Sequence, residues 1–216
     1  MDKWTTDDDC SPRRWRLHVS RGRRPLCPSL FMLHRFANPS RWSTFDELNF
    51  NWYTPGGSQS DGITWANHIS NTFKVSNVTG FLYWWGAAEK NDTEMLVLIN
   101  GTNIVQPTAR LWAHAHFGKR FVRQGAKRID ATSTSASLNV TAFANTDRTV
   151  AVQVINNSNN TESLTLKLPW GYRSVQTYLT NQHYDLKEGR ARVGWRKKST
   201  TVKIPGQSLL SLYLCK

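Results

Sequence analysis

Aromatic side chains are concentrated in one short run of the sequence, Tyr83, Trp84 and Trp85, enclosed by Gly80 and Gly86. The flat faces of tyrosine and tryptophan can bind the apolar side of a sugar ring, as they bind other rings and cations. We therefore interpret this run as a candidate sugar-binding platform, with Trp85 or Trp84 as the residue that stacks on the sugar. The alternative for each tryptophan is plain packing within a buried strand.

Acidic residues and histidines elsewhere in the chain raise the question of hydrolytic or metal chemistry. Glu89 and Asp92 follow the aromatic run and are interpreted as solvated loop acids rather than as a catalytic pair. His114 and His116 are two positions apart within an expected helix, about 200° apart around its axis. Side chains on opposite faces of a helix cannot bind one ion, so we expect packing or surface histidines, no metal site and no cofactor.

Six Asn-x-Ser/Thr motifs mark potential N-glycan sites, at Asn77, Asn91, Asn100, Asn139, Asn156 and Asn159. Chance in a chain rich in these residue types would give roughly half as many. The excess predicts the body of a secreted glycoprotein, and the alternative is an accident of Asn-rich surface loops. The only early apolar run, residues 30–33, is shorter than a signal-peptide core. We therefore expect this chain to lack its own signal peptide and membrane span.

The chain has 28 Lys and Arg against 15 Asp and Glu, a net charge of +13 that would suit a nucleic-acid partner. Nine of the basic residues fall within residues 1–44, where no apolar period is sustained. We predict that this segment is irregular, either disordered or foreign to the fold. Because six potential glycan sites argue against a nuclear or cytosolic protein, we expect no nucleic-acid partner. Since no membrane span is expected, we expect no membrane partner either.

Longer apolar segments that could position the aromatic run begin at about residue 45. Apolar residues recur at every fourth position after Asp61, which predicts an amphipathic helix. Asp61 can cap its start, and the helix is expected to end near residue 74. Residues 80–86 form a continuous apolar run, typical of a strand buried on both faces, and a second strand is expected at residues 95–99. A proline in the first turn and a glycine beyond the end predict a helix over residues 107–122.

From residue 127 the apolar period becomes two, as in half-buried strands. The alternating sets are Leu138, Val140 and Ala142; Val150, Val152 and Val154; Leu164, Leu166 and Leu168; Val202 and Ile204; and Leu210, Leu212 and Leu214. Turn-forming residues separate them at 145–147, 156–160, 169–171, 188–189 and 205–206. Short strands punctuated in this way predict an antiparallel β-sandwich over residues 126–216.

Three of these segments, residues 61–69, 80–86 and 109–129, together resemble glycoside hydrolase family 30, and most closely its endo-β-1,6-galactanase-like enzymes. The resemblance extends from about residue 45 to the C-terminus. It implies an α+β fold in which residues 45–125 are the remnant of a (β/α)8 barrel. That remnant would comprise about strands seven and eight with their helices, followed by the antiparallel β-sandwich.

The resemblance also implies a retaining hydrolysis that needs two glutamates, one as acid/base and one as nucleophile. The acid/base glutamate belongs to strand four, upstream of the similar region. At the end of strand seven the matching stretch reads Arg-Trp-Ser-Thr, which places Thr44 in the nucleophile slot. A hydroxyl group without an adjacent base cannot form the glycosyl ester, and the alternative nucleophile, Glu47, is offset by three residues. We therefore expect no catalytic residue to be retained.

By the same resemblance, Asn49, Trp52 and Tyr53 lie in the loop after strand seven and are further candidates for the sugar cleft. The expected function is that of a retaining endo-β-1,6-galactanase-like hydrolase of β-linked galactan or a related polysaccharide, inactive in this chain. The alternative is a non-catalytic, carbohydrate-binding β-sandwich protein. The parent family is secreted, a polysaccharide is the expected partner, and the chain is expected to be a monomer.

Overall fold

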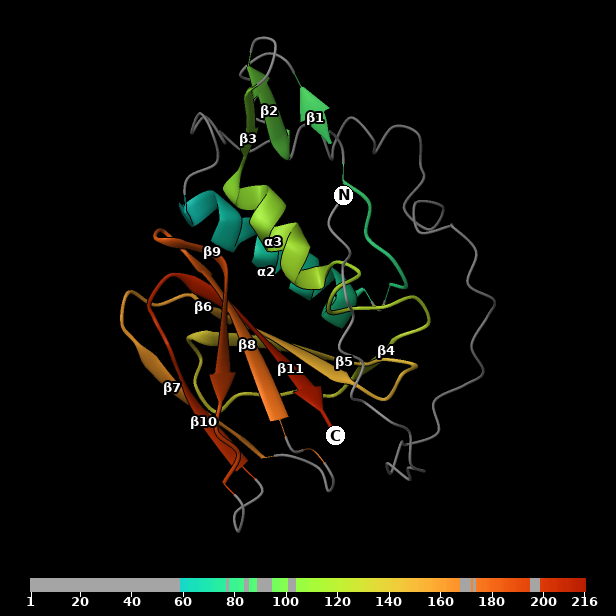
Figure 1. The fold of residues 1–216 in the computed structure, drawn as a ribbon, viewed down its shortest axis with the longest axis vertical. Coiled ribbons are helices and arrows are strands. Elements are labelled where there is room, and N and C mark those ends of the chain that lie inside the picture. Colours follow the sequence, from blue (N-terminus) through green and yellow to red (C-terminus); the bar gives the residue numbers. More distant parts are fainter. Residues whose placement is uncertain are drawn as a thin grey trace, which may run out of the picture.

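A computed structural model of the chain describes residues 59–76, 78–83, 86–88, 95–100, 104–167, 172, 174–194 and 199–216. These residues form a layer of two helices, a six-stranded sheet and a two-stranded sheet (Figure 1). A small three-stranded sheet lies on the far side of the helices from the sandwich. The segment predicted to be foreign to the fold, residues 1–44, lies outside the described residues.

The first described helix, α2 (Gln59–Val75), agrees with the predicted one except that it begins two residues earlier. Asp61 therefore lies in the first turn, where its negative charge suits the positive end of the helix dipole. Ile63, Ala66 and Ile69 are its buried apolar residues. They line one side of the helix and pack it against the sandwich.

The second helix, α3 (Ala109–Phe117), is shorter than the predicted helix at both ends. Its N-cap is Thr108, whose hydroxyl oxygen accepts a hydrogen bond from the backbone N–H of Leu111. The preceding Pro107 belongs to a strand instead. The helix ends at Gly118, before the predicted stop at Gly125, which has a φ of 80° in the following turn. In the described part of the chain, no helix is long and apolar enough to cross a bilayer.

The small sheet contains β1 (Ala87–Ala88), β2 (Val97–Asn100) and β3 (Ile104–Pro107) in that order. β1 runs parallel to β2, and β3 runs antiparallel to it. The predicted second strand agrees with β2, but the prediction of a strand over residues 80–86 was wrong for the described residues there, 80–83 and 86. Among the described residues no strand pairs with 80–83, whose Tyr83 is hydrogen-bonded to α3 instead.

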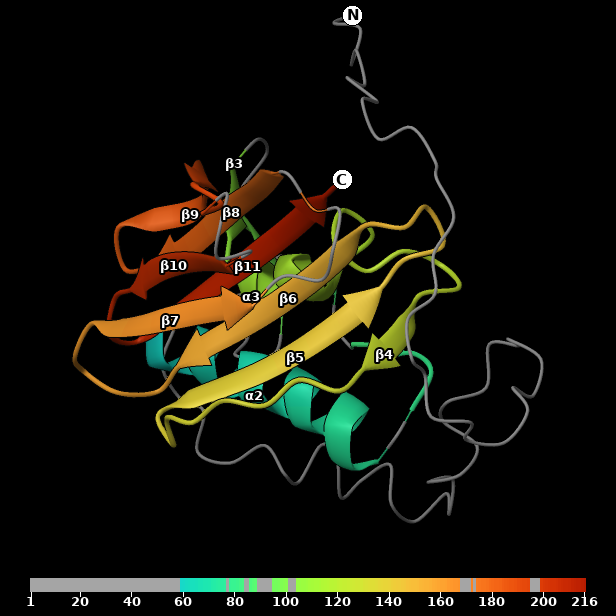
Figure 2. The same ribbon diagram turned by 90° about the horizontal axis from the view of Figure 1, so that it is seen from below.

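The six-stranded sheet is antiparallel throughout and forms the centre of the molecule. Its strands, in spatial order, are β4 (Lys127–Ile129), β5 (Leu138–Ala144), β6 (Val150–Asn156), β11 (Ser208–Cys215), β8 (Ser174–Asn181) and β9 (Tyr184–Ala191). On one face lies the antiparallel pair β7 (Glu162–Lys167) and β10 (Ser199–Ile204) (Figure 2). The main core between the two sheets consists of alternating side chains of these strands, so the sandwich prediction is confirmed.

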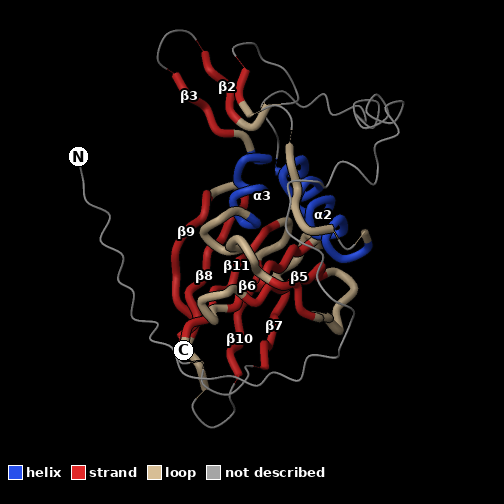
Figure 3. Tube along the Cα trace, turned by 90° about the vertical axis from the view of Figure 1, so that its right-hand side faces the viewer, coloured by secondary structure: helices blue, strands red, loops and turns tan. Residues whose placement is uncertain are grey.

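The two helices cover the other face of the six-stranded sheet (Figure 3). Ile63 and Ala66 of α2 and Ala113 of α3 form a second core cluster with Ile155 and Leu209 of the sheet. As a result β6 is buried at all seven positions, although its sequence predicts a half-buried strand. A period of two cannot reveal that a second layer covers the opposite face.

Five strands were not predicted from the sequence: β1 and β3 of the small sheet, and β4, β8 and β9 of the six-stranded sheet. β9 is an edge strand that is exposed at most positions, so it lacks the apolar alternation on which the predictions depended. The turn predicted at residues 188–189 was wrong, because both residues lie within β9 opposite Tyr178 and Thr177. A Cβ atom on Gly189 would lie 2.7 Å from Thr177 Oγ1, which explains why a glycine occupies this strand position.

His116 connects α3 to the six-stranded sheet and is fully buried. Its Nδ1 lies 2.7 Å from Ser211 Oγ, and its Nε2 lies 2.8 Å from Thr180 Oγ1. The side-chain amide of Gln153 donates to the His116 carbonyl at 3.0 Å. Burial lowers the pKa of His116 to about 3, so the ring is neutral in the folded protein. The expectation of a packing histidine is confirmed.

The buried histidine predicts an acid-sensitive fold. Because its pKa is lower in the folded than in the unfolded chain, its contribution to stability is complete above the ordinary value of 6.5 and is lost as the pH falls towards 3. By pH 5 it should cost about 2 kcal/mol of the unfolding free energy. We expect the stability difference between pH 7 and pH 5, measured by urea unfolding, to shrink by that amount in His116→Gln. The control His183→Gln, at an exposed position in the β8–β9 turn, should keep the parent's difference; an equal change in both variants would contradict this role for His116.

The loop between β6 and β7 is docked on the turn between β10 and β11. The backbone N–H of Gln207 donates to the Ser158 carbonyl at 2.8 Å. A Cβ atom on Gly206 would lie 2.3 Å from the carbonyl carbon and oxygen of Asn159. The two segments therefore touch backbone to backbone, and only glycine fits at this position.

Replacement of Gly206 by alanine should destabilise the chain by about 1–3 kcal/mol, because the loop must move to admit the methyl group. The matched control is Gly118→Ala, where the nearest heavy atom to the new Cβ would lie 3.4 Å away. We expect that variant to unfold within about 1 kcal/mol of the parent. Chemical unfolding at pH 7 measures both, and equal stabilities would contradict the docking of the loop.

Asn156 organises this loop from a fully buried position. Its Nδ2 donates to the carbonyl oxygens of Asn160 at 2.8 Å and of Ile204 and Pro205 at 3.0 Å. Its Oδ1 accepts hydrogen bonds from the backbone N–H and the hydroxyl of Ser158. The Asn156 nitrogen therefore faces the interior of the fold, where these contacts leave little room for a glycan, and glycosylation at Asn156 stays a prediction.

Candidate functional site

Most of the residues predicted to form the site lie outside the described residues: Thr44, Glu47, Asn49, Trp52, Tyr53, Trp84 and Trp85. The structure describes one of them, Tyr83, and shows what holds it. Its surroundings come from α2, α3 and the segment before β1. We refer to Tyr83 with Asp61, Trp65, Arg110 and His114 as the Tyr83 cluster.

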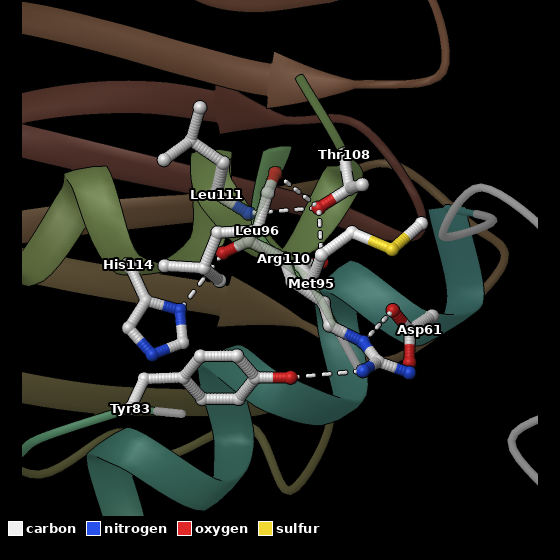
Figure 4. Close-up of polar contacts among 8 residues, drawn as sticks. All are labelled: Asp61, Tyr83, Met95, Leu96, Thr108, Arg110, Leu111 and His114. Carbon is white, nitrogen blue, oxygen red and sulfur yellow. Dashed lines mark hydrogen bonds and ion pairs between the residues drawn. The ribbon is translucent and has the colours of Figure 1, made fainter. Parts of the chain in front are cut away.

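The Tyr83 side chain is held at its hydroxyl and on its ring. Arg110 Nη1 donates a hydrogen bond to the Tyr83 hydroxyl oxygen at 2.9 Å (Figure 4). The ring makes edge contacts with Trp65 at 4.7 Å between centroids and 87° between planes, and with His114 at 4.7 Å and 67°. Aromatic pairs favour such edge geometries. Tyr83 is therefore fixed against both helices, and the aromatic run that it begins starts from a fixed point.

Arg110 is itself fixed by a buried ion pair with Asp61. Its Nε donates to Asp61 Oδ2 at 2.6 Å, and only 2% of Arg110 and 4% of Asp61 are exposed. Burial raises the pKa of Asp61, and the hydrogen bond and charge of Arg110 oppose that rise. Burial tends to lower the pKa of Arg110, but its bonds and charge interactions with Asp61 and Tyr83 outweigh burial and raise it. Its guanidinium also lies 5.5 Å from the centre of the Trp65 ring.

His114 adds a neutral ring with a defined proton position. Its Nδ1 lies 2.9 Å from the Arg110 carbonyl, which can only accept, so Nδ1 carries the proton and Nε2 is the acceptor. Burial lowers the pKa of His114; the hydrogen bond to the Arg110 carbonyl opposes this, and the charge of Arg110 adds a smaller lowering. The rings of Phe81, Tyr83 and Trp65 surround it. Within the described residues no group of three or more acidic, histidine or cysteine side chains could hold a metal ion, and His114 belongs to this aromatic packing.

The N-terminus of α3 joins the Tyr83 cluster to the small sheet. The Thr108 hydroxyl donates to the Leu96 carbonyl at 2.8 Å, while the Thr108 N–H bonds the same carbonyl at 3.0 Å. Met95, beside it, is 2% exposed. The small sheet, α3 and the aromatic segment are therefore joined, and a displacement of one is opposed by the others.

The sequence pattern does not predict that Asp61 and Arg110 are partners. They are 49 positions apart, and the pair forms only when the two helices pack. A signal was present within α3, because Arg110, Ala113 and His116 recur every three residues and are its buried residues. Two polar side chains on the same helix face as a buried alanine indicate internal partners.

The cluster is suited to positioning rather than to bond cleavage. Its one carboxylate, Asp61, is enclosed between the helices in an ion pair. Retaining glycoside hydrolysis needs two carboxyl groups about 5–5.5 Å apart on either side of the sugar bond. The Tyr83 cluster therefore holds the Tyr83 side chain in place and has no acid placed for catalysis.

Comparison with known proteins gives the class of this fold. The family model for the glycosyl hydrolase family 30 beta sandwich domain matches residues 125–212. The catalytic domain of a family 30 xylanase C from Talaromyces cellulolyticus is 30% identical, with a TM-score of 0.64, over 76% of this chain and 37% of that one. A family 30 endoxylanase from Clostridium papyrosolvens has the same TM-score at 20% identity, over 76% and 40%, and shows the fold alone.

The similarity to the Talaromyces structure extends beyond the sandwich. It covers 76% of the chain, whereas the family model of the sandwich domain matches only residues 125–212. The helices and the small sheet therefore correspond to part of a catalytic domain, and the α+β fold class of a barrel remnant followed by a sandwich is confirmed. Residues 125–212 are identified by the match to the family model as a family 30 β-sandwich domain, and the chain as a whole is similar to part of family 30 enzymes. It spans 37% to 40% of the length of these two solved structures.

Proposed function

We propose that this chain is the C-terminal part of a secreted, retaining family 30 hydrolase of β-linked polysaccharides, with β-1,6-galactan as the substrate of the whole enzyme. The match of residues 125–212 to the family's sandwich domain carries the proposal. The galactan rests on the resemblance of residues 61–69, 80–86 and 109–129 to the galactanase-like enzymes. The solved structures are xylanases by their titles, so xylan is the competing substrate.

We further propose that the 216-residue chain does not hydrolyse its polysaccharide. Asp61 is enclosed in the Tyr83 cluster, and three other acids pair with arginines in the pairs Arg120–Glu188, Arg123–Asp147 and Arg128–Asp130. Each of these four carboxylates is already engaged by an arginine. The alternative is a non-catalytic carbohydrate-binding protein built on the β-sandwich, whose family domain matches residues 125–212.

One experiment on the purified full chain tests both proposals. We expect no reducing ends from β-1,6-galactan or xylan above a heat-treated control, and slower migration in a gel that contains galactan than in one that contains xylan. Release of sugar would overturn the inactivity. Retention by xylan in preference to galactan would overturn the substrate, and no retention by either would overturn carbohydrate binding. Size-exclusion chromatography tests the proposed monomer.

The Tyr83 cluster predicts how a conservative change should act on binding. Tyr83→Phe keeps the ring but removes the oxygen that accepts from Arg110, and it should weaken galactan retention severalfold because the adjacent aromatic segment loses its fixed start. The matched control is Tyr184→Phe on β9, where the tyrosine is 41% exposed. Affinity electrophoresis with circular dichroism of both variants separates lost binding from lost folding. Equal retention of the two folded variants would contradict the positioning role.

A further inference from the structure

Three of the potential N-glycan sites have side chains within the described residues, and the fold uses them in different ways. Asn139 lies on β5, Asn156 ends β6, and Asn159 lies in the β6–β7 loop. An N-glycan is attached through the side-chain nitrogen and needs open space around it. The surroundings of each Nδ2 therefore decide which site a folded, exported molecule can carry.

The amide of Asn139 is an internal contact between β5 and α2. Its Nδ2 donates to Asn67 Oδ1 at 2.8 Å and to Asn71 Oδ1 at 3.3 Å. Its Oδ1 accepts from Ser70 Oγ at 3.2 Å and from Lys74 Nζ at 2.7 Å. Both ends of the amide are thus bonded to one face of α2. A glycan on this nitrogen would separate the helix from the sheet, so Asn139, like Asn156, is suited to a structural role.

Asn159 has the opposite surroundings. Its side chain is exposed and makes no hydrogen bond to any described residue, and the other two residues of the motif, Asn160 and Thr161, are exposed as well. The backbone beneath it is nevertheless fixed, because Ser158 Oγ accepts from the Asn160 N–H at 3.2 Å and the loop lies against Gly206. The loop therefore presents an accessible amide from a rigid base.

We propose that Asn159 carries an N-glycan in the exported protein, whereas Asn139 and Asn156 remain unmodified structural amides. The donor is an oligosaccharide linked to a polyisoprenyl diphosphate. Asn159 Nδ2 bonds to the first sugar carbon and loses one proton, while the bond from that carbon to the diphosphate breaks and the lipid diphosphate leaves. Attachment precedes folding, so chains modified at Asn156 would fail to fold and would be retained. The inference rests on the extracellular location within the proposed function.

The test uses the full chain behind a cleavable secretion signal in a eukaryotic host, with glycopeptide mass spectrometry of the secreted product. We expect Asn159 to be occupied in most molecules, and Asn139 and Asn156 to be unmodified. Asn159→Gln and Thr161→Ala should each remove one glycan from the intact mass. The matched control Asn160→Gln changes an adjacent exposed residue but preserves the motif, so it should leave the mass of the glycans unchanged.

Two results would overturn the proposal: an unmodified Asn159, or a glycan at Asn139 or Asn156 in protease-resistant, secreted protein. If little protein reaches the medium, translation into microsomes followed by protease treatment gives the same occupancies on the folded fraction. The readout is independent of polysaccharide binding. Failure to bind galactan with Asn159 glycosylated would reject the proposed substrate alone, and galactan binding with Asn159 unmodified would reject the glycan site alone.

Discussion

Arg110→Met should lower the unfolding free energy of the chain by about 3–5 kcal/mol at pH 7, because it leaves the Asp61 carboxylate buried without its cation. Methionine fills much of the space of the arginine stem, so the loss reports on the charge and the hydrogen bonds more than on a cavity. The Tyr83 hydroxyl loses its donor in the same variant. Urea unfolding followed by tryptophan fluorescence and circular dichroism measures the change.

The pH dependence of this loss identifies its cause. A buried carboxyl group whose folded pKa is raised contributes stability at acidic pH that is lost as the pH rises through that pKa. Burial already raises the pKa of Asp61 beside Arg110, and removal of the arginine removes the two interactions that oppose the rise. The difference between Arg110→Met and the parent should therefore be smaller at pH 5 than at pH 7. A difference independent of pH would indicate lost packing instead.

Two further variants separate the ion pair from a general effect of removing an arginine. Asp61→Asn combined with Arg110→Met should be more stable than Arg110→Met alone, because the uncompensated charge is gone. Arg120→Met removes an arginine from an exposed pair with Glu188 and should cost no more than about 1 kcal/mol. A double variant no more stable than the single one would contradict this account of the Asp61–Arg110 pair.

The strands that were predictable from the sequence are those whose apolar residues alternate because one face packs against the core between the two sheets. β5, β6, β7, β10 and β11 face the core between the sheets with alternate residues, and each was predicted. β9 lies at an edge and alternates little, so its Gly189 was mistaken for a turn residue. The end of α3 at Gly118 was not predictable either, because apolar residues continue beyond it to Phe121. The Phe121 ring lies beyond the helix and makes an edge contact with the Tyr178 ring.

The candidate site was predictable in its residue types more than in its construction. Tyr83 was predicted to line a sugar site because it belongs to an aromatic run that the family resemblance places at the C-terminal end of barrel strand eight. The Asp61–Arg110 pair that holds it depends on how two helices cross, which a single sequence does not specify. The amides behave similarly: Asn139, Asn156 and Asn159 carry the same motif, and only tertiary packing distinguishes a structural amide from an accessible one.

Asn156→Asp should be the most damaging isosteric change in the sandwich, with an expected loss of about 3–5 kcal/mol at pH 7. The substitution replaces a donor that faces three carbonyl oxygens by an oxygen, and it places a negative charge where exposure is 0%. Protonation of the new carboxyl group restores one donor, so the loss should diminish as the pH falls. Unfolding measurements at pH 7 and pH 4, each referred to the parent at the same pH, provide the test.

The matched control for this change is Asn159→Asp, because it alters the same group on the same loop at an exposed position. We expect its stability to lie within about 0.5 kcal/mol of the parent, as for surface substitutions away from special features. If both aspartates cost the same, the Asn156 network would not be what holds the β6–β7 loop on the β10–β11 turn. A large loss at Asn156 alone would instead show that one amide connects β6, the loop and the end of β10, and that this site must stay free of any modification for the sandwich to fold.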